Sequence, residues 1–387
     1  MITGSGLGCG RRETTAPAVP QRATMNVVES RTDPEMPRYR GDSRQFHRLS
    51  RRTARRTALS ALIGLAALGP LAAPVFAHGQ VPAEPPTIGN LLLGWSFDPA
   101  LVLPLLLIGG GWIALVRRVN AAHPATPVPA RRSVAFLAGV ATIAIALQSG
   151  IERYDTTLFS VHMVQHLLLT LVAAPLLALG APITLLLRAA TPRARQRVIL
   201  PILHSRVVRV LGFPVVAWLL FAGVMWATHF SPLFDLALEN RLVHDLEHVL
   251  YLGSALLFWW PAVGLDPAPW RLPHPVRALY VFLQMPQNTF LAVVILNAAV
   301  PLYPHYVTLA RSWGPTPLVD QQMAGGIMWL GGDLLFIAAI AGVIYGWMRR
   351  EEAENARVDR RLDAERAAIR ARETRLAERL ADERESR

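Results

Sequence analysis

The chain has 387 residues, of which 52% are hydrophobic and only 17% are charged, a composition typical of proteins solvated largely by lipid. The net charge of +12 does not indicate nucleic-acid binding, because the arginines flank apolar segments instead of forming a stripe with interleaved aromatic residues. The only cysteine is Cys9, which excludes a disulfide framework and a thiolate metal site. Any bound metal would therefore use His, Met and carboxylate ligands.

The N-terminal part of the chain reads as a disordered segment followed by an export signal. Residues 1–56 are basic and rich in Pro, Ser and Thr without apolar periodicity, which predicts disorder. The apolar segment 57–77 follows paired arginines and ends with small residues at Val75 and Ala77, which favours a signal peptide cleaved after Ala77. An uncleaved anchor helix is the alternative, because the segment is about as long as a membrane span. Cleavage would place His78 at the mature N-terminus, where its amine and ring nitrogen could assist copper binding.

Residues 78–348 predict an all-α, polytopic domain with seven transmembrane helices. Each apolar segment is long enough to cross a bilayer, and each must be helical because lipid offers the backbone no hydrogen-bond partners. The segments lie near 99–116, 133–150, 159–187, 210–228, 243–263, 276–300 and 321–348.

Arginine placement predicts the orientation of these segments. The loops that follow the first, third and fifth spans are rich in arginine, and the loops between them are not. Cytoplasmic loops carry the excess of Arg and Lys, so we expect a plasma (inner) membrane protein with its mature N-terminus outside and its C-terminus in the cytoplasm. Residues 349–387 alternate Glu, Asp and Arg, which predicts a charged cytoplasmic helical tail.

Histidines gather at the ends of spans that this topology places at the outer surface. The third span opens with His162 and His166, and the fifth opens with His244 and His248. A spacing of four residues puts both imidazoles of each pair on one face of a helix. One such pair is a weak motif, but its recurrence at the same membrane level favours a metal site.

The expected metal is copper, because imidazole and thioether ligands together suit it, with zinc as the competitor on ligand type alone. Met225 and His229, again four apart at the end of the fourth span, are the expected auxiliary ligands. Asp155, Asp245 and Glu247 are near enough in sequence to orient the ring N–H groups.

Two further polar groups lie deeper in the predicted spans. Gln284, Gln287 and Asn288 share a face of the sixth span, and Asp333 lies well inside the seventh. Helix-to-helix hydrogen bonding is the favoured interpretation, with a ligand role as the alternative. The doublet Gly325-Gly326 predicts a close helix contact.

From about residue 90 to residue 348 the chain resembles the membrane-embedded cytochrome c oxidase assembly factors of the CtaG type, which are associated with caa3-type oxidases. The matching blocks are His162-Met163-Val164-Gln165-His166 leading to Gly180-Ala181-Pro182, His244-Asp245-Leu246-Glu247-His248 leading to Trp259-Trp260-Pro261, and Asp320-Gln321-Gln322-Met323-Ala324-Gly325-Gly326 leading to Trp329 and Asp333. The resemblance implies a seven-span protein that acts in respiratory-chain biogenesis, with oxidase subunits as partners, through copper delivery. It implies an assembly factor rather than an enzyme.

Three other functions compete with this interpretation. A b-type cytochrome would use histidines on different helices as axial haem ligands. A copper transporter would need polar residues across the bilayer, for which Gln284, Asn288 and Asp333 are the candidates. A metal-dependent hydrolase is the third alternative, but the chain lacks both an HExxH motif and an obvious Ser or Cys nucleophile.

Overall fold

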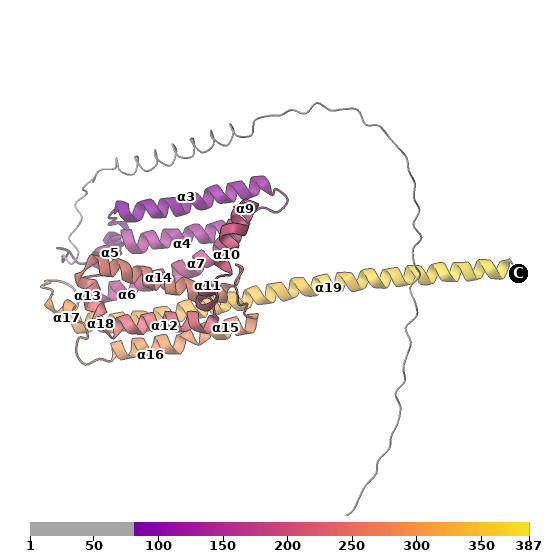
Figure 1. Cartoon of the computed structure of the whole chain (residues 1–387). Coiled ribbons are helices and arrows are strands. Elements are labelled where there is room, and N and C mark those ends of the chain that lie inside the picture. The colour runs from indigo at the N-terminus through magenta and orange to yellow at the C-terminus, as the bar shows by residue number, and fades with distance from the viewer. Residues whose placement is uncertain (1–80, 387) are drawn as a thin grey trace, which may run out of the picture. The chain divides into compact units, whose positions relative to one another are not determined.

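Long apolar helices dominate the structure, as a lipid environment requires, because a helix satisfies its backbone hydrogen bonds within itself. The structure is a computed structural model and describes residues 81–386 (Figure 1). The described residues form helices and no strand, which confirms the all-α prediction for this part of the chain. The predictions for residues 1–56, for segment 57–77 and for His78 concern positions outside the described residues.

The helices follow one another with short connections. The first group is α2 (Ile88–Leu93), α3 (Pro99–Ala122), α4 (Ala130–Gln148), α5 (Gly150–Tyr154), α6 (Phe159–Leu167), the π-helical turn η1 (Leu168–Ala173), α7 (Ala174–Gly180) and α8 (Pro182–Ala189). The second is α9 (Pro192–Ala194), the π-helical turn η2 (Arg195–Ile199), α10 (Leu200–Leu203), α11 (Arg206–Leu211), α12 (Pro214–His229), α13 (Leu233–Glu239) and α14 (Arg241–Val263). The third is α15 (His274–Phe282), α16 (Gln284–Leu296), α17 (Pro304–Thr308), α18 (Pro317–Gly326), the π-helical turn η3 (Ile327–Gly331) and α19 (Gly332–Glu385).

Five continuous helical stretches are long and apolar enough to span a membrane: 99–122, 130–154, 159–189, 274–296 and 317–385. The pair α12 and α13, bent by 71° at a short break, adds a sixth if it is counted as one span. The predicted fifth span corresponds to α14, which has 23 residues but begins with Arg241, His244, Asp245, Glu247 and His248. These polar residues make α14 too polar to count among the candidate spans. The described residues therefore show a membrane protein but do not confirm the predicted count of seven spans.

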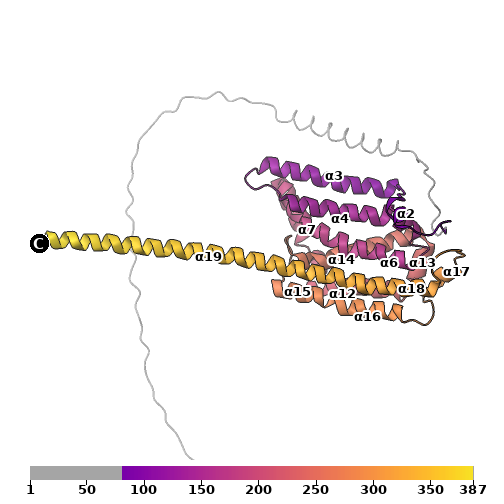
Figure 2. The ribbon, with the colours of Figure 1, turned by 180° about the vertical axis from the view of Figure 1, so that it is seen from behind.

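The two ends of the helical bundle differ in character. Consecutive long helices alternate in direction, so α5, α13 and α17 lie at one end while α9, α10, α11 and the start of α15 lie at the other (Figures 1 and 2). Arginines concentrate at the second end: near the end of α3 and the start of α4, along α8 to α11, and at Arg271 and Arg277 around the start of α15. Both predicted histidine pairs lie on the opposite end, because α6 and α14 begin there.

Two buried apolar clusters hold the bundle together. One includes Phe159, Phe221 and Phe258 and joins α6, α12, α14, α16 and α18, and the other includes Trp112 and Phe136 and joins α3, α4 and α7. Close approach of α18 to α16 depends on Gly325, where an added Cβ would lie 2.8 Å from Leu296 N. The predicted close contact of the glycine doublet is thus made by Gly325, whereas a Cβ at Gly326 would meet nothing within 4 Å.

Candidate metal centre

The two histidine pairs meet inside the bundle and form one group, the histidine cluster, defined as His162, His166, His244 and His248. Ring centroids lie 4.1 Å apart within the α6 pair and 4.2 Å apart within the α14 pair. Across the two helices, His162 is 5.5 Å from His244, and His166 is 6.0 Å from His248. All four residues are at most 5% exposed. The spacing of four residues therefore places the rings at two levels: His162 and His244 are stacked with an interplanar angle of 26°, and His166 and His248 are edge-to-face at 86°.

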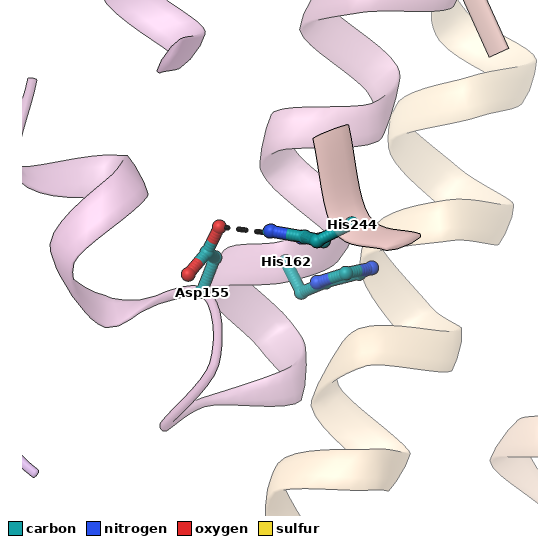
Figure 3. A group of neighbouring side chains, drawn as sticks. All are labelled: Asp155, His162 and His244. Carbon is teal, nitrogen blue, oxygen red and sulfur yellow. Dashed lines mark ion pairs between the residues drawn. The ribbon is translucent and has the colours of Figure 1, made fainter. Parts of the chain in front are cut away.

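Two buried carboxylates adjoin these rings. Asp155 Oδ2 lies 3.6 Å from His244 Nε2, and both side chains are 1% exposed (Figure 3). Potential ligand atoms of Asp155, His162 and His244 all lie within 4.8 Å of one another, as do those of His162, His166 and Glu247. The side chains of His162, His166 and Glu247 have no hydrogen-bond partner among the described residues. Buried polar atoms normally have partners, so this arrangement of nitrogen and oxygen donors fits a bound cation.

Asp155 is held in place by residues from α17. Its backbone carbonyl accepts a hydrogen bond from Tyr306 Oη at 3.0 Å, and the carbonyl of Thr156 lies 2.9 Å from His305 Nε2. The Thr156 backbone N–H donates to Asp155 Oδ1 at 2.5 Å. Burial raises the pKa of the Asp155 carboxyl well above its usual range. A bound cation would offset this cost of ionisation.

The α6 pair is positioned by a carboxylate that caps the helix. Phe159 N–H donates to Asp320 Oδ2 at 2.7 Å, and Ser160 Oγ donates to Asp320 Oδ1 at 2.5 Å. A negative charge at a helix N-terminus satisfies N–H groups that have no partner within the helix. Asp320 lies on α18, so this contact fixes where α6 begins and hence the direction of His162.

A glutamine contacts His248. Its Nε2 atom lies 3.0 Å from Gln165 Oε1. Gln165 Nε2 in turn donates to Glu152 Oε2 at 2.7 Å and to the Ala146 carbonyl at 3.0 Å. Since Oε1 can only accept, this contact requires the proton on His248 Nε2. His248 lies beside both three-residue ligand groups and belongs to neither.

The expected auxiliary ligands are linked to the cluster through a tyrosine. The ring of Tyr251 stacks on His166 with centroids 4.2 Å apart, and its hydroxyl lies 3.2 Å from His229 Nδ1. His229 Nδ1 also lies 2.8 Å from the Met225 carbonyl. Met225 thus contacts His229 through its backbone, while its side chain lies in the apolar core.

The deeper polar residues are used mainly for contacts between helices. Asn288 Nδ2 donates to the Met328 carbonyl at 3.2 Å, and Thr289 Oγ1 donates to Asp333 Oδ2 at 2.9 Å. Trp226 Nε1 donates to Gln287 Oε1 at 2.7 Å. Gln284 is 1% exposed, and its amide has no partner among the described residues.

Sequence reasoning assigned Asp155 and Glu247 only a supporting role and missed Gln165 and Tyr251. Tyr251 follows His244 by seven residues and His248 by three, so helical spacing places all three on one face. That spacing is a usable signal. Gln165 stands between the α6 histidines, but its contact with α14 depends on the tertiary fold.

Residues 110–350 match the family described as cytochrome c oxidase caa3 assembly factor. Uncharacterized proteins of Mycobacterium bovis and Mycobacterium tuberculosis are each 32% identical to the chain over 304 residues, which cover 76% of this chain and 45% of theirs. A similar protein of Mycobacterium leprae is 30% identical over 298 residues. The chain therefore spans less than half the length of these curated relatives. No solved structure matches it.

Proposed function

This chain belongs to the cytochrome c oxidase caa3 assembly factor family, and from that premise we propose that it binds copper in the histidine cluster and delivers it to oxidase subunits. Copper is then the cargo of a protein that is not an enzyme. The proposed ligands are His162, His166 and His244, together with Asp155 and Glu247. His248 supports them by packing against His244, and Met225, His229 and His78 remain auxiliary candidates.

The meeting of histidines from α6 and α14 with two buried carboxylates carries this proposal. Three imidazoles and two carboxylates form two overlapping groups of three residues. Within each group the ligand atoms lie within 4.8 Å of one another, close enough to bind one ion. Imidazole suits copper and zinc, whereas magnesium and calcium favour all-oxygen sites. Haem fits less well, because axial ligands approach the iron end-on from opposite faces, while His162 and His244 lie nearly face to face with an interplanar angle of 26°.

The distribution of charge supports delivery at the outer face of the plasma membrane. Arginines concentrate on the helix ends and short helices at the end of the bundle opposite the histidine cluster. Arginines concentrate on the cytoplasmic side of membrane proteins, so the cluster would face outward. The proposed topology places the C-terminus in the cytoplasm and the mature N-terminus, including His78, outside.

The test is copper analysis of the purified protein after incubation with Cu(I) under reducing conditions. We expect the unaltered protein to retain copper and a His162→Ala/His166→Ala/His244→Ala variant to lose it. A His123→Ala/His204→Ala variant is the matched control, because these exposed histidines lie near the opposite end. Thermal unfolding of each variant shows whether it is folded.

A cellular measurement tests delivery. Cells whose own copy is replaced by the triple variant should assemble oxidase with less copper and lower activity, while the control variant should restore both. Equal copper in the unaltered protein and the triple variant would remove the ligand assignment. Normal oxidase with the triple variant would remove the delivery role.

A further inference from the structure

The ligand groups at the histidine cluster overlap in one residue. One group consists of Asp155, His162 and His244, and the other of His162, His166 and Glu247. Among the described His, Asp and Glu residues, no set of four places all of its ligand atoms within 4.8 Å of one another. A single ion therefore has two three-donor positions available, and His162 is common to both.

The two positions differ in depth along the helices. His166 follows His162 by four residues on α6, which corresponds to about 6 Å along a helix axis. His244 is likewise the outer histidine of α14, because α14 begins at this end of the bundle. Asp155 lies in the connection between α5 and α6, next to His162 and His244 (Figure 3). The group with Asp155 is thus the outer position, and the group with Glu247 is the inner one.

The donors of the two positions are chemically equivalent. The outer position offers His244 and Asp155 in addition to His162, and the inner position offers His166 and Glu247. Each position has two imidazoles and one carboxylate, so an ion moving between them exchanges ligands of the same kind. The positions should therefore have similar affinity, and His162 keeps the ion bound during the exchange.

We propose that the histidine cluster is a two-position relay in which one copper ion passes between the outer and the inner group while remaining bound to His162. This inference rests on the proposed function, since it requires copper to be the cargo. Three donors leave Cu(II), which takes square-planar or tetragonal coordination by nitrogen and oxygen ligands, with an open position at either site. An incoming ligand can then bind before the outgoing one leaves, which suits an ion that must be handed on.

The inner position is suited to hold the ion away from the bundle end because it lies about one helical turn deeper. His166 packs against Tyr251, and the donors of both positions are at most 5% exposed, so depth along the helices and not exposure distinguishes them. The outer position is formed partly by a connecting segment that α17 braces through Tyr306 and His305. The relay would therefore load or release copper through the outer group and store it in the inner group.

The experiment is continuous-wave electron paramagnetic resonance of the purified protein with one equivalent of Cu(II) added as a salt. For the unaltered protein we expect a spectrum with two components and a single bound copper. Asp155→Asn and His244→Ala should each leave the same inner component. Glu247→Gln and His166→Ala should each leave the same outer component.

His162→Ala removes the shared ligand and should weaken copper binding by at least about 10-fold. Loss of a residue that only supports a ligand already reduces metal affinity by about this factor. Glu239→Gln, at an exposed position just before α14, is the control and should keep both components. The relay is overturned if all four single-position variants lose copper as fully as His162→Ala, if they do not sort into these two spectral classes, or if the unaltered protein binds two coppers at once. The proposed function itself fails if the unaltered protein binds no copper. It also fails if the His162→Ala variant binds copper as tightly as the unaltered protein does.

Discussion

Asp320 on α18 accepts the backbone N–H of Phe159 at 2.7 Å, although the two residues are 161 positions apart in the sequence. Asp266 makes the equivalent contacts at the other end of the bundle, where it accepts the backbone N–H groups of Ile183 and Thr184 and the Thr184 hydroxyl. Both carboxylates thus cap the first turn of another helix. Only the helix held by Asp320 carries histidines of the cluster.

This pair gives a matched test of positioning. Asp320→Ala and Asp266→Ala should each lower the free energy of unfolding by about 1–2 kcal/mol, because each removes a helix cap. Only Asp320→Ala should weaken copper binding, since it releases the start of α6. Thermal unfolding in detergent and copper titration measure the two effects. Equal copper affinity in both variants would show that the α6 cap does not position the ligands.

Removal of the Tyr306 hydroxyl should weaken copper binding without removing a ligand. Tyr306→Phe breaks the hydrogen bond to the Asp155 carbonyl, and loss of a supporting partner typically reduces metal affinity by about 10- to 100-fold. Tyr280→Phe is the control, because the buried Tyr280 hydroxyl has no partner among the described residues. Competition with a copper chelator measures the affinities. Indistinguishable affinities for the two variants would contradict the bracing role of α17.

Gln165→Leu should destabilise the protein more than it affects copper content. The change leaves His248 Nε2 without its partner at 3.0 Å and removes the link to Glu152. Buried hydrogen bonds between membrane helices contribute about 1–2 kcal/mol at most, so a loss of this size in the free energy of unfolding is expected. Gln322→Leu, at an exposed position of α18, should have little effect. Complete loss of copper from Gln165→Leu would instead indicate that His248, which Gln165 holds in place, is a ligand.

The neighbouring glycines of α18 should respond differently to a methyl group. Gly325→Ala would place Cβ 2.8 Å from Leu296 N and 3.0 Å from the Ala292 carbonyl. Crowding of this kind costs about 1–3 kcal/mol. Gly326→Ala meets nothing within 4 Å and should be neutral or stabilising by up to about 1 kcal/mol. Melting temperatures of the two variants test this difference. A similar decrease for both would show that Gly325 is not the point of close contact between α18 and α16.

Local spacing was enough to predict much of the site. The four-residue spacing of His162 with His166 and of His244 with His248 fixes which rings share a helix face, and alternating arginine-rich loops predict that both pairs lie at one end of the bundle. The structure brings these pairs together. Metal binding itself remains a prediction.

The rest of the site depends on contacts between segments far apart in the chain. Asp155 reaches His244 because Tyr306, 151 residues later, holds its carbonyl. The contact of His229 Nδ1 with the Met225 carbonyl could not be predicted from the four-residue spacing of the two side chains, and their auxiliary ligand role remains a prediction. The expected fifth span is a helix, but the histidines and acids that build the site make α14 less apolar than the other long helices.

The continuity of α19 has a mechanical consequence. It runs from Gly332 to Glu385, and its sequence contains no proline and no glycine beyond Gly346. At 1.5 Å per residue, the exposed part from 351 to 385 is about 50 Å long. Because the helix is continuous, binding of a partner near Glu385 could displace or rotate the buried part of α19 around Phe336 in the core.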